Sequence, residues 1–74
     1  MLRNGLWVLN EGKVGILSAI AGVSAEFHQT DDDGFTLMVY PVQLSDVAQA
    51  SFGDIPTARR PDEETARRLG YLSI

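Results

Sequence analysis

Cysteine is absent from this 74-residue sequence, and histidine occurs only once. Without cysteine the chain has neither a disulfide framework nor a thiolate zinc site, which suits an intracellular setting. No segment approaches the ~20 apolar residues of a membrane-spanning helix, and the N-terminal apolar run is too short and broken for a signal peptide. The sequence therefore predicts a cytoplasmic protein with no membrane partner.

Basic residues are scarce over most of the chain. Residues 1–56 hold two basic residues, Arg3 and Lys13, against seven acidic ones, whereas residues 57–74 hold four arginines against three acidic residues. Modules that bind nucleic acid usually present a basic stripe or patch. The acidic body argues against DNA, RNA and anionic membranes as direct partners, although the arginine-rich end could still contact phosphate.

The motifs that would carry chemistry are incomplete. The stretch Gly12-Lys13-Val14-Gly15 contains a Gly-Lys pair, but a phosphate-binding loop needs a glycine five residues earlier, a serine or threonine after the lysine, and a following helix. None of these is present, because the pattern that follows is that of a strand. We interpret Gly12 as a turn residue and Gly15 as a close-packing or bulge residue.

The polar residues from His28 to Asp33 give no site either. Residues Asp31–Asp33 lack the alternate spacing and the closing glutamate of a calcium loop of the EF-hand type. His28 has Glu26 two residues away but no nucleophile in a recognisable motif. The sequence therefore predicts no catalytic residue, no metal and no cofactor, and a non-enzymatic protein.

Alternating apolar and polar residues predict a mostly-β fold. Residues 6–9 form an apolar run, and the strand expected over 13–20 has apolar residues in both parities. Two later segments alternate cleanly. The predicted inward residues are Val23, Ala25, Phe27, Phe35, Leu37 and Val39; the predicted outward ones are Ser24, Glu26, His28, Thr30, Thr36, Met38 and Tyr40.

Turn residues separate these segments. Asp33-Gly34 is a hairpin signal, with Gly34 free to adopt the positive φ that such turns need. Pro41 cannot donate to a ladder, so its strand should be an edge or bulged. A helical turn is expected near residues 45–50, and residues 51–56 form either a last short strand or an extended segment. The result is a small barrel of about five short antiparallel strands.

The last 18 residues have a helical pattern. Acidic residues 62–64 follow Pro61, Arg67 and Arg68 fill the last turn, and Gly70 follows as a stop signal, which predicts a helix over 61–69. So short a helix is marginal alone. It must dock through Ala66, Leu69 and Tyr71 or Leu72. We expect one domain, with a barrel over residues 1–56 and a helical tail over 57–74 packed on the barrel or on a partner.

Two aromatic residues and the tail arginines are candidate binding residues. Trp7 and Tyr40 have the parity opposite to their apolar neighbours, so they either form an exposed interaction surface or pack under the C-terminal helix. The tail arginines could pair with Asp46 or Asp54 of the barrel, or reach outward to an acidic partner. The candidate partner-binding residues are Trp7, Tyr40, Arg59, Arg60, Arg67 and Arg68; the candidate turn residues are Gly12, Gly15 and Gly34.

The pattern "GKVGILSAI" followed by "AEFHQTDDDG" resembles the strand-loop-strand of KOW-type SH3-like barrels, with Gly15 at the KOW glycine position. The wider layout is similar to small proteins encoded in tailed phages and prophages. This resemblance implies an SH3-like barrel and a virion or phage accessory role, in the cytoplasm of a bacterial host or in the virion. The strands differ from nucleic-acid-binding KOW modules in their scarcity of lysine and arginine.

We therefore expect a non-catalytic protein-protein interaction or assembly module, with protein partners or a second copy of itself. One alternative is a KOW-like module that binds nucleic acid or a ribosome or transcription complex. Another is an acidic inhibitor of a host factor.

Overall fold

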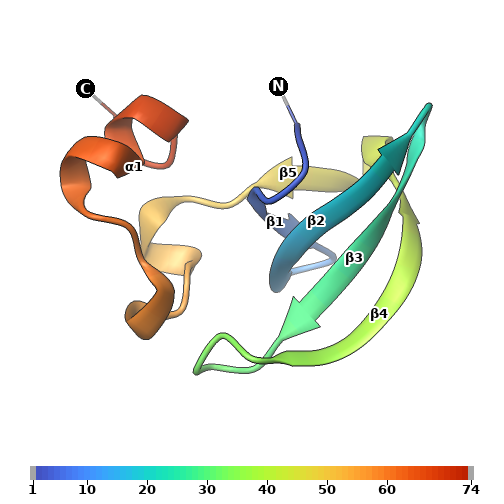
Figure 1. Cartoon of the computed structure of the whole chain (residues 1–74), viewed down its shortest axis with the longest axis horizontal. Helices are drawn as coiled ribbons and strands as arrows, with labels where there is room; N and C mark the ends of the chain where they lie inside the picture. The colour runs from blue at the N-terminus through green and yellow to red at the C-terminus, as the bar shows by residue number, and fades with distance from the viewer. Residues whose placement is uncertain (1, 74) are drawn as a thin grey trace.

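The computed structural model describes residues 2–73, which form five strands, three short 3₁₀ turns and one α-helix. In chain order the elements are β1 (Trp7–Asn10), β2 (Lys13–Ala21), β3 (Ser24–Thr30), β4 (Thr36–Gln43), η1 (Leu44–Asp46), β5 (Val47–Gln49), η2 (Phe52–Asp54), η3 (Thr57–Arg59) and α1 (Glu63–Leu69). The strands form one antiparallel sheet in the order β4-β3-β2-β1-β5 (Figure 1). The predicted mostly-β fold of about five antiparallel strands with a short C-terminal helix is confirmed.

Of the three candidate turn glycines, Gly12 and Gly34 lie in hairpin turns, whereas Gly15 lies within β2 and in no turn. Glu11 and Gly12 join β1 to β2 with φ of 52° and 79°, as a two-residue type I′ turn requires. Gly34 has φ of 87° and donates its N–H to the carbonyl of Asp31 at 3.0 Å. Both positions need a left-handed backbone that glycine adopts at least cost.

The inner face of the sheet carries the main core. The side chains of Val8, Leu17 and Phe27 are completely buried, and Leu17 lies directly opposite Phe27 in the β2–β3 ladder. The ring of Phe27 contacts that of Tyr40 edge to face, with centroids 5.5 Å apart. The predictions that Ala25 and Phe27 point inward are confirmed.

Gly15 lies in β2, where the Phe27 ring approaches the backbone. A Cβ atom at this position would lie 2.7 Å from Phe27 Cζ and would also collide with the carbonyl oxygen of His28. We expect Gly15→Ala to destabilise the fold by about 1–3 kcal/mol because of overpacking. Gly53→Ala is the matched control, since nothing lies within 4 Å of its Cβ position. Equal urea midpoints for the two variants would contradict this account of Gly15.

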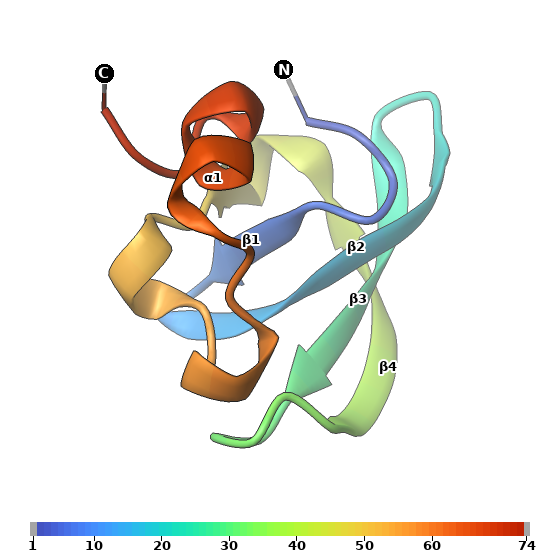
Figure 2. The ribbon, with the colours of Figure 1, turned by 60° about the vertical axis from the view of Figure 1, so that its left-hand side comes forward.

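The C-terminal tail covers the outer side of β1. Trp7 is only 8% exposed and belongs to the same buried cluster as Ala66 and Tyr71. The N–H of Trp7 donates to Tyr71 Oη at 2.8 Å, and Gln49 Nε2 donates to the carbonyl of Leu69 at 2.9 Å. In Figure 1 and Figure 2 the tail, in orange and red, lies at the end of the sheet that holds β1 and β5. The tail therefore packs on the sheet of its own chain.

The helix of the tail begins two residues later than expected. Asp62 is its N-cap and accepts a hydrogen bond from the N–H of Thr65 at 3.4 Å. Hydrogen bonding to Thr65, first from its side chain and then from its N–H, lowers the pKa of Asp62. Gly70 ends the helix with φ of 90°. Within residues 2–73 no helix is long and apolar enough to cross a membrane.

The inward positions predicted for β4 are wrong. Phe35, Leu37 and Val39 are 62%, 61% and 49% exposed. The pairing shows that the alternation is inverted: Val39 lies opposite His28, on the outer face, and Tyr40 lies opposite the buried Phe27. The outward position predicted for Tyr40 is therefore wrong as well. The ladder also shifts register between Gln29 and Thr30, near Leu37.

Two further predictions around β3 are wrong. Val23 was expected to point inward but is exposed, because it lies in the turn between β2 and β3. Thr30 was expected to point outward but is buried. Both lie at the ends of β3, where a strand's alternation no longer decides which side is covered.

The end of the sheet also differs from the prediction. The fifth strand is Val47–Gln49, and the helical turn expected near 45–50 lies earlier, at Leu44–Asp46. Residues 51–56 form no strand, because Asp54 bends them into η2. The Asp54 carboxylate accepts one hydrogen bond from the hydroxyl of Ser51 at 2.7 Å and another from the N–H of Ser51 at 3.0 Å. The hydrogen bond from the Ser51 side chain is the main reason that the pKa of Asp54 is lowered.

Candidate functional site

The most unusual surface of the molecule is an exposed apolar segment at the sheet edge. We call residues 35–39 the β4 edge. Besides the three apolar residues described above, Met38 is 53% exposed. Because successive strand residues point to opposite faces, both faces of this strand are apolar where it meets solvent. Exposed apolar side chains gathered along one strand mark a candidate interaction site.

The turn before β4 fixes the start of this surface. Asp31 Oδ1 accepts hydrogen bonds from the N–H groups of Asp33 and Phe35, both at 2.9 Å. The guanidinium carbon of Arg59 lies 5.3 Å from the centroid of the Phe35 ring, a distance at which a cation and an aromatic face attract. Phe35 is therefore held in place by the local turn at Asp31 and by Arg59, which is distant in sequence.

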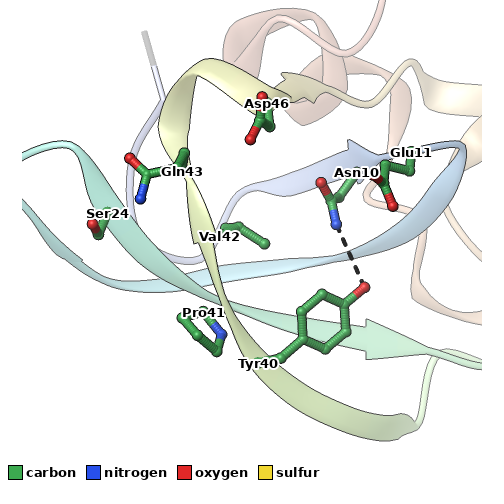
Figure 3. Close-up of a pocket in the computed structure, with 8 residues that line it drawn as sticks. All are labelled: Asn10, Glu11, Ser24, Tyr40, Pro41, Val42, Gln43 and Asp46. Atoms are coloured by element: carbon green, nitrogen blue, oxygen red, sulfur yellow. Dashed lines mark hydrogen bonds between the residues drawn. The ribbon is translucent and has the colours of Figure 1, made fainter.

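A shallow groove of about 380 Å³ lies on the other side of β4 (Figure 3). It is lined by residues of β1, β3, β4 and the adjoining turns: Asn10, Glu11, Ser24, Tyr40, Pro41, Val42, Gln43 and Asp46. Figure 3 shows the Tyr40 ring and Pro41 on one side of the groove and the Glu11 and Asp46 carboxylates across from them.

The Tyr40 hydroxyl is fully engaged within the chain. It donates to Gln29 Oε1 at 2.9 Å and accepts from Asn10 Nδ2 at 3.5 Å. Its ring is also fixed by the contact with Phe27. The groove thus offers a rigid aromatic wall and two surface carboxylates, which suits contact with a side chain of another molecule.

No known protein family, curated protein or solved structure matches this chain.

The two predicted aromatic residues play different roles. Trp7 is buried beneath the tail and offers no surface to a partner. Tyr40 is partly exposed and lines the groove. Of the two alternatives open for Trp7, packing under the C-terminal segment is the one found.

The predicted arginines do not form one binding patch. Arg60 donates to the backbone carbonyls of Ile55 at 2.8 Å and Gly53 at 3.0 Å, so it closes the loop of its own chain rather than pairing with Asp54. Arg67 forms an ion pair with Glu63 at 3.3 Å. Arg68 is exposed, and Arg59 lies over Phe35 as described above.

The remaining polar candidates show no catalytic or metal-binding arrangement. His28 Nε2 lies 3.7 Å from Glu26 Oε1. In the described part of the chain, no group of three or more His, Cys, Asp or Glu residues is placed to hold a metal ion. Asp31 belongs to the aspartate run that was considered as a calcium loop, and its side chain accepts the hydrogen bonds that hold the hairpin turn.

Sequence reasoning missed the β4 edge, although a signal was present. Pro41 already indicated an edge strand. On an edge strand, alternation does not guarantee that the apolar face is covered. Met38 and Val39 are adjacent and both apolar, so they point to opposite faces of the strand. This indicated that neither face is purely polar at this point.

Proposed function

We propose that this chain is a non-catalytic protein-binding module of the SH3-like barrel type, with a virion or accessory role in a phage or prophage. The observation that carries the protein-binding role is the β4 edge, where Phe35, Leu37, Met38 and Val39 are about half exposed or more. The chain as a whole is acidic, with net charge −4, and an exposed apolar surface on it marks a site of contact with another apolar surface.

The barrel type and the biological setting depend on the resemblance stated above. Five short antiparallel strands, with the fifth paired to the first, support the SH3-like barrel. Gly15 supports the KOW-like strand-loop-strand, because close packing demands glycine there. The protein would act in the cytoplasm of a bacterial host or in a virion.

The charge distribution favours a protein partner over nucleic acid. No lysine or arginine occurs between Lys13 and Arg59, so β3 and β4 carry no group that could neutralise phosphate. RNA binding with a steep salt dependence, measured by fluorescence anisotropy, would instead favour the KOW-like alternative.

The test is capture from infected or lysogenic cells with three tagged full-length baits: wild type, Leu37→Glu and Ala48→Glu. Ala48 is exposed on β5, at the opposite end of the sheet order, so it gives the same charge change away from the β4 edge. We expect a protein that wild type and Ala48→Glu retain and that Leu37→Glu loses by roughly tenfold or more, as loss of one well-buried apolar contact would give. An identical set of captured proteins with all three baits would overturn the proposal.

A further inference from the structure

The β4 strand is the long free edge of the sheet. It has eight residues and one neighbouring strand, β3. At the other end of the sheet, β5 has only three residues, and the side chain of its Gln49 is bonded to the tail. A long apolar edge strand is a template for pairing with another strand, and proteins protect such edges with charged residues, proline or bulges. β4 contains Pro41 and a register shift near its start, but it has no charged residue.

The backbone of β4 presents hydrogen-bonding groups at this edge. Pro41 lies opposite Glu26 and Val39 lies opposite His28, in a regular part of the ladder. Because proline has no N–H, the Glu26–Pro41 pair belongs to the pairs that exchange no ladder bonds. Val39, two residues away, belongs to the same class. Its N–H and C=O therefore point away from β3, toward the open side.

The charges of the chain decide which partner fits this edge. Residues 34–45 contain no Asp, Glu, Lys or Arg, whereas the whole chain has net charge −4. Two copies of an acidic chain repel each other over most of their surfaces. Along β4 they can meet without opposing like charges, and each covers the apolar side chains of the other. A partner with a basic strand would find no acidic side chain in this segment to pair with.

We propose that two copies of the chain associate antiparallel through β4, about a twofold axis at Val39, so that one sheet runs through both copies. The proposal deepens the protein-binding role above by naming the partner. In this register Val39 lies opposite Val39 of the second copy, and the two residues exchange a pair of N–H···O bonds. Met38 then lies opposite Tyr40 of the second copy, and Leu37 opposite its Pro41, which has no N–H to donate, so the reciprocal pair of bonds is confined to Val39. Twofold dimers are the commonest homo-oligomers of soluble proteins.

The charge on each copy sets the salt dependence. Since each copy is acidic, added salt screens their repulsion. Dimerisation should therefore strengthen as ionic strength rises. Binding to a basic strand or to nucleic acid would weaken under the same change.

The test is sedimentation equilibrium of the purified full chain at low and high salt, with three variants. Val39→Lys places two lysines directly opposite each other at the axis, and like charges in contact cost enough to weaken dimerisation by roughly 100-fold or more. Ala48→Lys carries the same charge change on β5 and should dimerise like wild type. Mixing Val39→Lys with Val39→Glu should restore a heterodimer, because opposite charges then face each other.

Circular dichroism first confirms that each variant is folded, which is expected because the Val39 side chain is about half exposed. A wild type that stays monomeric at all concentrations and salt levels overturns the self-pairing. It leaves the protein-binding role to be decided by the capture experiment. A dimer that persists unchanged in Val39→Lys also overturns the proposal, because the copies would then be joined by another surface.

Discussion

A chain cut after Pro56 is expected to lose its cooperative fold at 25 °C. The cut removes Ala66 and Tyr71, both in the core cluster, and uncovers Trp7. Removing one buried aromatic side chain typically costs about 3–5 kcal/mol. A domain of this size has a total stability of only about 4–11 kcal/mol. The tail is thus part of the core rather than an appendage of a finished barrel.

Circular dichroism melting of the truncated chain is the measurement, with two full-length variants beside it. Tyr71→Phe keeps the ring but leaves the buried N–H of Trp7 without its acceptor, which should cost about 1–3 kcal/mol. Arg68→Ala is the control, because this side chain is exposed and should change stability by no more than about 0.5 kcal/mol. A truncated chain that melts like the full one would show that the tail is not structural.

The sequence predicts best where local chemistry alone decides the structure. In β3 one face is buried along the middle of the strand, so alternation placed Ala25 and Phe27 correctly. The glycines at 12 and 34 lie where the backbone needs positive φ, and the local sequence of each turn predicted this. The existence and the end of the tail helix also followed from local signals, with Gly70 as the stop residue, whereas Asp62 was expected in the first turn and is the N-cap.

Predictions fail where the answer depends on contacts distant in sequence. Pro41 correctly indicated that β4 is an edge strand, but alternation does not say which of its two faces the rest of the chain covers. Trp7 has the parity of an exposed residue, yet the C-terminal tail covers it. The hydrogen bond from the N–H of Trp7 to Tyr71 Oη joins residues 64 positions apart. For this reason the candidate site lies on a strand that the sequence placed in the core.

A comparison of Phe27→Ala with Val39→Ala tests this difference directly. The two residues belong to neighbouring paired strands and both were expected in the core, but Phe27 is completely buried and Val39 is about half exposed. Phe27→Ala should cost about 3–5 kcal/mol, because it leaves a cavity beside Leu17 and Tyr40.

In contrast, Val39→Ala should change the free energy of unfolding by no more than about 0.5 kcal/mol when measured on the monomer, since surface substitutions rarely do more. Urea denaturation at low protein concentration separates the two, because dilution removes any contribution from self-association. If both variants lose several kcal/mol under these conditions, then Val39 is buried in the monomer and the β4 edge is not a free surface. If Val39→Ala loses stability only at high protein concentration, the lost contacts are those with another copy of the chain.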